Sequence, residues 1–355
     1  MKRLKRIAAL VTRGRPPVGT TPADVIAHEN KWRLLHYRPR PQGVAFATPV
    51  LLVPSLINRH YVMDLLPGKS MAEDFVAAGH DVYCIDWGTP GDEDRYLTFD
   101  DICDRYLGRA IRQVAGQSER GHVHLLGYCL GGTLAVIRAA ARPELVASLV
   151  LLAAPVRFSE DMGLLETWVK SPSFDVRGLV AAFGNVPWPL MQGAFNLLRP
   201  TLGLVKAVGV ADRAGREDES ALGAQRWADF ADGFLALETW GNDNISFPGE
   251  AYVRYIEELY RRDALMAGTF ALSGQPVRLE NIACPTLAVV FEHDNIVPWR
   301  NAAVLVDRIS SSDKQLLKLP GGHVGAVVSR AAQKRLWPAL RAFWAARDGG
   351  DSKAD

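Results

Sequence analysis

The residue with the clearest chemical potential is Cys129, which lies in the segment GYCLG at positions 127–131. This segment follows an apolar run at positions 122–126 and precedes a helical pattern, so Cys129 is expected on a sharp turn from a strand into a helix. Glycines two residues away on either side let neighbouring backbones pass without a clash. Because a helix N-terminus favours the thiolate over the thiol, we predict that Cys129 is a reactive nucleophile and not a buried structural cysteine.

An acid and a base follow later in the chain. Asp294 lies in the loop after an apolar run at positions 286–291, and His323 lies in the segment LPGGHVG, just after the last predicted strand. Nucleophile, acid and histidine thus occur in the order that α/β-hydrolases use. Glu292 and His293 are alternatives for the acid, but a turn with two apolar residues and a proline follows Asp294, as in the acid loop of that fold. We predict that His323 is the base and that Asp294 orients it.

The other histidines and cysteines have weaker claims to a chemical role. His122 and His124 alternate along a predicted strand, too early in the chain for the triad, and no third and fourth zinc ligands lie near them. No CxxC pair occurs, so neither a disulfide framework nor a zinc ribbon is indicated. The four cysteines are Cys84, Cys103, Cys129 and Cys284. We expect no metal site.

An oxyanion hole needs two backbone N–H donors near such a nucleophile. One is expected from Leu130, the residue after the nucleophile, and the other from the loop that follows the strand ending at Val53. Pro54 has no N–H, so the second donor is predicted to be Leu56 or Ile57, and the sequence leaves both open.

The surrounding elements indicate an α/β-hydrolase fold with a mostly parallel, doubly wound sheet. Nearly continuous apolar runs predict strands that are buried on both faces, and helical patterns between them predict parallel βαβ units. The predicted strands lie at positions 49–53, 80–85, 122–126, 148–153, 286–291 and 315–319, and the clearest helices at 71–78, 99–114 and 132–141.

The alternation of strand and helix stops after the run at 148–153 and returns only near Thr286. Amphipathic segments at 221–239 and 250–263 predict a mainly helical cap over the carboxyl edge of the sheet, where ligands bind in open α/β sheets. The expected organisation is a basic N-terminal arm at 1–20, core at 21–156, cap at 157–280, core at 281–346 and a polar tail at 347–355, with the ordered part ending near Ala346.

Composition narrows the class of protein. Hydrophobic residues make up 48% of the chain and charged residues 23%, which predicts an ordered globular protein, and a net charge of +2 gives no reason to expect a nucleic-acid partner. No apolar stretch has the length of a signal or membrane-spanning segment, so the cytoplasm is the expected location. The first fifteen residues carry basic side chains without one acidic residue, which suits an anionic surface or a solvated arm.

These segments together resemble the polyhydroxyalkanoate synthases, which polymerise 3-hydroxyacyl-CoA thioesters into polyester. The resemblance runs from about Thr21 to about Val328. It rests on SLINRHYVMDL at 55–65, DWGTP at 86–90, GYCLGG at 127–132, the FPG within 242–249, the segment 274–279, DNIVPW at 294–299 and GGHVG at 321–325. The absence of a long N-terminal extension is similar to the catalytic subunits of two-subunit (class III/IV) synthases.

The resemblance implies a Cys-His-Asp acyltransferase in which Cys129 carries the acyl chain and His323 and Asp294 are the catalytic histidine and acid. It implies 3-hydroxyacyl-CoA, most simply 3-hydroxybutyryl-CoA, and the polyester chain as substrates, with coenzyme A as part of the substrate and no separate cofactor. It also implies a second, non-catalytic subunit and a location at the surface of polyester granules. We further expect a homodimer.

One position departs from the family pattern, because synthases usually carry histidine directly after the catalytic aspartate and this chain has Asn295. Asparagine cannot transfer a proton as imidazole does, so the change bears on polymerisation more than on formation of the acyl-cysteine. Two alternative functions remain: a thioesterase or intracellular polyester depolymerase with the same triad, and a non-catalytic granule-associated homologue.

Overall fold

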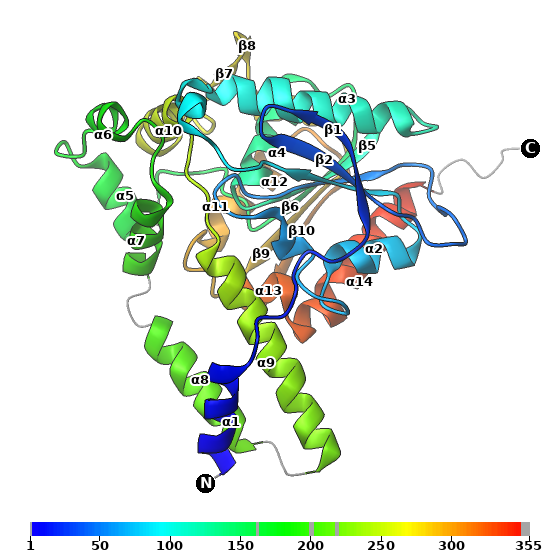
Figure 1. Cartoon of the computed structure of the whole chain (residues 1–355). Helices are drawn as coiled ribbons and strands as arrows, with labels where there is room; N and C mark the ends of the chain where they lie inside the picture. Colours follow the sequence, from blue (N-terminus) through cyan, green and yellow to red (C-terminus); the bar gives the residue numbers. More distant parts are fainter. Residues whose placement is uncertain (1, 161–162, 199–201, 217–219, 349–355) are drawn as a thin grey trace, which may run out of the picture.

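A computed structural model describes residues 2–160, 163–198, 202–216 and 220–348. Its centre is an eight-stranded sheet in the order β1-β2-β4-β3-β5-β6-β9-β10 (Figure 1). All neighbouring pairs from β4 to β10 are parallel, whereas β2 is antiparallel to both β1 and β4. This arrangement confirms the predicted α/β-hydrolase fold.

The six predicted strands are all present. They are β3 (Val50–Val53), β4 (Val82–Asp86), β5 (Val123–Tyr128), β6 (Val146–Leu152), β9 (Thr286–Phe291) and β10 (Lys314–Leu319). All but the edge strand β10 are buried, because helices cover the side chains on both faces. The remaining two strands, β1 (Ala23–Glu29) and β2 (Trp32–Tyr37), were not predicted. β1 is half-exposed at the edge and carries Asp24, His28 and Glu29, so it lacks the continuous apolar run of a central strand.

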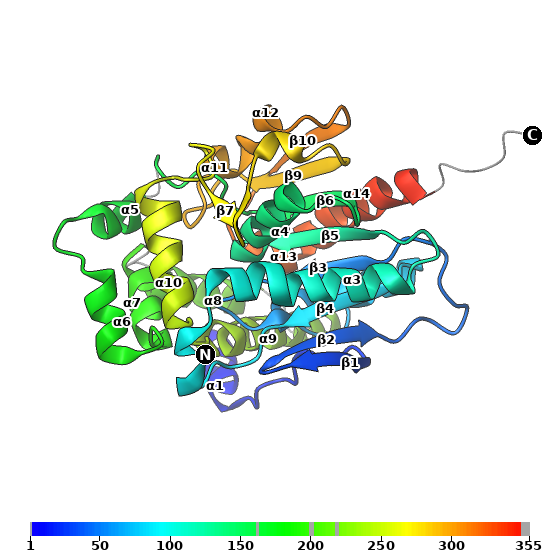
Figure 2. The same ribbon diagram turned by 90° about the horizontal axis from the view of Figure 1, so that it is seen from above.

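Helices cover both faces of this sheet (Figures 1 and 2). Alternate residues of each strand point to opposite faces, so Leu51 and Val53 pack with α3 (Leu107–Gln117) and α4 (Leu130–Ala141). Val50 and Leu52 pack instead with α2 (Met71–Ala78), α13 (Gly325–Val328) and α14 (Arg330–Asp348). Two apolar layers therefore fix the sheet and, with it, the loops at its carboxyl edge.

The insertion between β6 and β9 is mainly helical over its described residues. It contains α5 (Gly163–Lys170), α6 (Val176–Phe183), α7 (Trp188–Leu198), α8 (Leu202–Arg216), α9 (Ala221–Asn242), α10 (Gly249–Arg254) and the π-helix η4 (Tyr255–Arg261). A two-stranded hairpin, β7 (Ala271–Leu272) with β8 (Gln275–Pro276), follows these helices. Apolar residues of α6, α10 and η4 join the core cluster, so this cap is packed onto the sheet domain.

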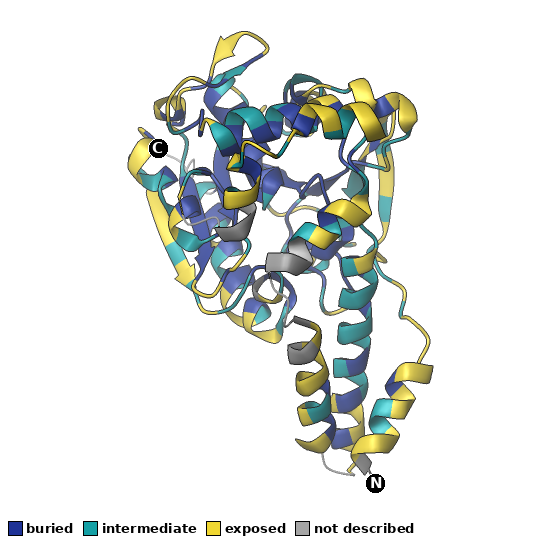
Figure 3. Cartoon of the chain, turned by 90° about the vertical axis from the view of Figure 1, so that its left-hand side faces the viewer, coloured by how far each residue is buried: buried dark blue, intermediate teal, exposed yellow. Residues whose placement is uncertain are grey.

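The N-terminal segment, expected as a basic arm, is a docked helix. Helix α1 (Lys2–Thr12) contacts α8 and is exposed over much of its surface (Figure 3). Its buried Leu10 packs in a small apolar cluster with Val210 and Trp227. The Arg13 guanidinium forms an ion pair with Asp232 at 2.6 Å. The segment docks because its apolar residues recur at helical spacing and form one apolar face. The expectation of a solvated arm considered only the basic side chains.

The C-terminal helix also continues further than expected. α14 includes Arg347 and Asp348, and the buried Asp348 carboxylate accepts hydrogen bonds from the backbone N–H groups of Ala47 at 2.6 Å and Thr48 at 3.0 Å. The polar tail was therefore expected to begin two residues too early. Asp348 is acidic, but it can be buried because its carboxylate pairs with backbone donors. Positions 349–355 lie outside the described residues.

Within the described part of the chain, no helix is long and apolar enough to span a membrane. The same residues contain no group of three or more histidine, cysteine, aspartate or glutamate side chains that could hold a metal ion.

Candidate active site

Cys129 lies at the turn from β5 into α4 with a backbone φ of 54°. Such a positive φ is strained for a residue other than glycine. The turn is possible because Gly127 and Gly131 lack side chains: a Cβ on Gly131 would lie 2.2 Å from the Val53 carbonyl oxygen, and one on Gly127 would lie 2.3 Å from the Cα of Gly132. The glycine spacing therefore holds the sulfur at the end of the strand.

The N-terminus of α4 places partial positive charge at the sulfur. The Cys129 carbonyl accepts the N–H of Gly132 at 2.9 Å, which begins the helix, so the N–H groups of Leu130 and Gly131 precede the first intrahelical bonds. Helix α4 is buried along nearly its whole length. The positive end of the helix dipole therefore lies at the sulfur.

Asp294 and His323 follow the neighbouring parallel strands β9 and β10, so the sheet brings them to one edge. His323 Nδ1 lies 2.7 Å from Asp294 Oδ2, and both side chains are buried. The other carboxylate oxygen, Oδ1, accepts the backbone N–H groups of Ile296 at 2.9 Å and Val297 at 2.8 Å. These two bonds fix the carboxylate, which in turn fixes the imidazole ring.

The Cys129 sulfur also interacts with the His323 imidazole and is one of the groups that raise its pKa. Burial by itself would lower the pKa of His323, but the negative charge of the Cys129 sulfur and the Asp294 carboxylate outweigh it and raise this pKa to about 10. The site therefore favours the protonated form of the His323 imidazole. The structure brings all three sequence-predicted residues together.

Tyr128 supports the histidine and was not singled out in the sequence. Its ring centroid lies 5.2 Å from that of His323, and its hydroxyl donates to the His323 carbonyl at 3.5 Å. The side chain is fully buried. Its position between Gly127 and Cys129 was the only signal available, because the partner loop is almost two hundred residues away.

Leu56 and Ile57, the two candidates for the second oxyanion donor, line different hollows in the structure. Ile57 lines the same cavity as Cys129 and Leu130, and its N–H donates to the Ser55 hydroxyl at 3.3 Å. Leu56 lines a different, small hollow beside Trp87. The Ile57 side chain therefore faces this cavity, whereas its N–H is bonded to Ser55.

The cavity beside Cys129 has a volume of about 180 Å³ and lies between the sheet edge and the cap. Its walls are mostly apolar. They include Ile296 and Val297 from the acid loop, and from the cap Trp168, Phe174, Leu179, Val186, Leu190, Met191, Ala194, Tyr252, Tyr255, Ile256 and Tyr260. An apolar space of this size, partly covered by the cap, suits a short acyl group.

The alternative side chains lie outside this cavity. Glu292 and His293 are exposed, and Glu292 lies 3.8 Å from Lys318. His124 is buried at the far end of β5, where its Nδ1 bonds the Ser148 hydroxyl at 2.8 Å. Asn295 is exposed and is not among the cavity residues. Neither the alternative acids nor Asn295 is among the residues that line the cavity.

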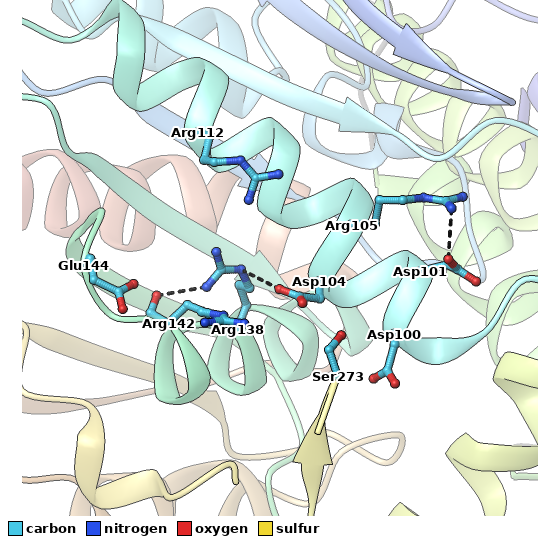
Figure 4. Close-up of a pocket in the computed structure, with 9 residues that line it drawn as sticks. All are labelled: Asp100, Asp101, Asp104, Arg105, Arg112, Arg138, Arg142, Glu144 and Ser273. Carbon is cyan, nitrogen blue, oxygen red and sulfur yellow. Dashed lines mark hydrogen bonds and ion pairs between the residues drawn. The ribbon is translucent and has the colours of Figure 1, made fainter. Parts of the chain in front are cut away.

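A larger hollow of about 510 Å³ lies at the other end of α4 and has a different character (Figure 4). Carboxylates and guanidinium groups alternate around it, and the buried Arg138 lies 3.6 Å from Asp104 and donates to the Arg142 carbonyl at 3.0 Å. A cationic side chain at a helix C-terminus stabilises the last carbonyl groups. Arg138 therefore stabilises the C-terminal end of α4, the helix whose N-terminal end carries Cys129.

The fold and the site define the class of protein as an α/β-hydrolase-fold protein with cysteine at the nucleophile position. The model of the alpha/beta hydrolase fold family matches residues 48–328. Among solved structures, the chain resembles a Paleococcus ferrophilus monoacylglycerol lipase (TM-score 0.53, 18% identity, 86% of this chain and 96% of that one). It also resembles MenH from S. aureus (TM-score 0.54, 14% identity, 90% and 99%).

A second family model, the N-terminus of poly-beta-hydroxybutyrate polymerase (PhaC), matches residues 13–75. Three curated relatives are named poly(3-hydroxyalkanoate) polymerase subunit PhaC. The Haloferax mediterranei protein is 36% identical over 95% of this chain and 67% of its own length. The Allochromatium vinosum protein is 34% identical over 91% and 88%, and the Synechocystis protein 32% over 92% and 85%. The chain therefore belongs to the poly(3-hydroxyalkanoate) polymerase family, as its motifs predicted.

Proposed function

We propose that this chain polymerises 3-hydroxyacyl-CoA, most simply 3-hydroxybutyryl-CoA, into polyester through an acyl-cysteine at Cys129. The observation that carries the proposal is the pairing of Cys129 with the buried His323–Asp294 dyad at the wall of an apolar, cap-covered cavity. Membership of the polymerase family supplies the class of substrate.

In the first step the Cys129 thiolate attacks the thioester carbonyl carbon. The oxyanion that forms receives hydrogen bonds from the Leu130 N–H and from the N–H of Leu56 or Ile57 in the loop after β3. The bond between the carbonyl carbon and the sulfur of coenzyme A then breaks. His323 gives its proton to that departing sulfur, and the acyl group stays on Cys129.

In the second step a 3-hydroxyl group attacks the acyl-cysteine. His323 Nε2 takes the hydroxyl proton, the new ester C–O bond forms, and the bond between the carbonyl carbon and Cys129 breaks. Asp294 holds His323 through Nδ1 during both steps and stabilises the imidazolium. The end state is again an imidazolium–thiolate pair, so the cycle requires no cofactor.

The apolar cap explains why the acyl group is passed to an alcohol and not to water. Hydrolysis of the acyl-cysteine would end the chain as a free acid, so water must be kept from the carbonyl carbon. A thioester on cysteine also remains activated for transfer, whereas serine would form a more stable oxygen ester. Both features favour a transferase over a thioesterase or depolymerase.

The partner subunit, the oligomeric state and the location of this chain are also proposals. The relatives are named as polymerase subunits, which supports a second, non-catalytic subunit for this chain as well. We further propose a homodimer and a location at the polyester granule surface, where an insoluble product must accumulate.

The assay that tests the function measures two products from 3-hydroxybutyryl-CoA. Purified protein should release coenzyme A and form polyester, more rapidly with a partner subunit, and Cys129→Ala should abolish both activities. Cys284→Ala removes a half-buried cysteine outside the cavity and should keep them. Release of monomeric 3-hydroxybutyrate without polymer would assign the chain to the hydrolases instead.

A further inference from the structure

Two tyrosines of the π-helix η4 (Tyr255–Arg261) line the cavity beside Cys129. Tyr255 and Tyr260 are both buried, at 7% and 3% exposure, and their hydroxyl oxygens lie 3.5 Å apart. Residues five apart are the hydrogen-bonded pair of a π-helix, so this geometry places the two side chains together. An α-helix would place position 260 on a different face from 255. π-helical turns occur frequently at functional sites.

These hydroxyl groups contrast with the rest of the cavity wall. Among the described lining residues, hydroxyl groups come only from Tyr252, Tyr255 and Tyr260. Tyr255 donates its hydrogen bond to the Tyr260 oxygen, which leaves the hydroxyl proton of Tyr260 for another acceptor. No protein acceptor for that proton is found among the described residues, and a buried polar group normally has a partner. A ligand bound in the cavity is therefore the remaining candidate for the acceptor of the Tyr260 proton.

The tyrosine pair lines the same cavity as the reacting sulfur. Burial raises the pKa of Tyr255 and of Tyr260, and the negative charge of Cys129 raises both further. Burial alone raises the pKa of Tyr252, which lines the same cavity. Both members of the pair therefore remain protonated donors at neutral pH, close enough to Cys129 to feel its charge.

We propose that Tyr260, supported by Tyr255, binds the 3-hydroxyl oxygen of the incoming 3-hydroxyacyl unit and directs its proton to His323. The proposal rests on the proposed polymerase function and adds the groups that select the attacking hydroxyl. Tyr260 donates to the hydroxyl oxygen, and that hydroxyl donates to His323 Nε2. In the transfer, His323 takes this proton, the oxygen bonds to the acyl carbon, and the carbon–sulfur bond to Cys129 breaks; Tyr260 keeps its own proton throughout.

In this arrangement Tyr260 acts in the extension of the polyester chain and not in the loading of Cys129. Loading of Cys129 requires no 3-hydroxyl group, so an unsubstituted acyl-CoA should load the sulfur and stop there. The same tyrosine should therefore matter for extension with 3-hydroxybutyryl-CoA and be dispensable for loading with butyryl-CoA. A purely structural tyrosine would affect both reactions alike.

The test compares Tyr260→Phe and Tyr255→Phe with the unmodified chain in these two reactions. Phenylalanine keeps the ring contact with Phe158, whose centroid lies 5.0 Å from that of Tyr260, and removes only the hydroxyl. Loss of one hydrogen bond to the substrate should slow polymer formation at saturating 3-hydroxybutyryl-CoA by about 10- to 100-fold in Tyr260→Phe. Tyr255→Phe should show a smaller loss, and butyryl-CoA loading should stay within about twofold in both.

The matched control is Tyr37→Phe, which removes a buried tyrosine hydroxyl on β2, outside the cavity lining. It should change neither reaction. Unchanged extension in Tyr260→Phe, or an equal loss of loading and extension, would overturn the proposal. Absence of polymer from the unmodified chain would instead refute the proposed function, so the two failures are distinguishable.

Discussion

Buried histidines in this protein have opposite electrostatic environments. His323 is surrounded by the Cys129 sulfur and the Asp294 carboxylate, and these negative charges keep it protonated. His80 and His124 lie at the other end of the sheet in an aromatic cluster with Trp344, where burial lowers the pKa of each to about 4. Burial alone does not set the charge of a histidine; its neighbours do.

The pair His80 and His124 predicts loss of stability in acid. Both folded-state pKa values lie below the ordinary 6.5, so the folded chain binds fewer protons than the unfolded chain between pH 6.5 and 4. Asp348 opposes the lowering, while Arg341 beside His80 and Arg347 and Arg120 beside His124 reinforce it. Stability is fully present above pH 6.5 and should fall by on the order of 2 kcal/mol per histidine between pH 7 and pH 5.

Urea unfolding at pH 7 and pH 5 measures this loss. His80→Phe keeps an aromatic ring against Phe46 and Trp344 and should show a smaller difference between the two pH values. His28→Gln, at an exposed position, should behave as the unmodified chain. An equal pH dependence in His80→Phe would show that these histidines do not control acid stability.

At the residue scale, spacing and chain order were enough to predict Cys129, Asp294 and His323, because each lies next to a strand with a strong apolar signal. The roles of Tyr128 and Tyr260 could not be predicted in this way. Their partners, the His323 loop and the Cys129 sulfur, lie far away in the sequence and meet them only after the sheet and cap have folded.

At the element scale, the strand–turn–helix from β5 into α4 depends on close backbone packing. A Cβ at position 131 would lie 2.2 Å from the Val53 carbonyl oxygen and 2.3 Å from that of Pro54. Gly131→Ala should therefore lower the free energy of unfolding by about 3 kcal/mol or more. The matched change Gly116→Ala in α3 meets no atom within 4 Å and should raise it by about 0.5–1 kcal/mol.

Thermal or urea unfolding of the two glycine variants distinguishes close packing from a general effect of alanine. Similar stabilities for Gly131→Ala and Gly116→Ala would show that the backbone at the turn relaxes freely.

The strands and helices themselves were predictable from the sequence where apolar runs are continuous, as in β9. The edge hairpin β1–β2 was missed because one side of an edge strand faces solvent and its sequence is mixed.

At the scale of the whole molecule, the cap lies over the edge of the sheet where Cys129 is found. Helices from the insertion supply most of the cavity wall, whereas the sheet domain supplies Cys129, His323 and Asp294. The sequence indicated a helical insertion from the break in strand–helix alternation. It gave no signal for the path of these helices or for the docking of α1 on α8, since both depend on contacts between segments distant in the chain.

The most direct test of the account is the identity of the atom that carries the acyl group. Incubation with butyryl-CoA, which lacks the attacking hydroxyl, should trap one butyryl group per chain, and mass spectrometry of the digested protein should place it on the peptide that contains Cys129. Cys129→Ala should carry none. Release of coenzyme A with the acyl group on another residue, or on none, would contradict an acyl-cysteine at the strand–helix turn.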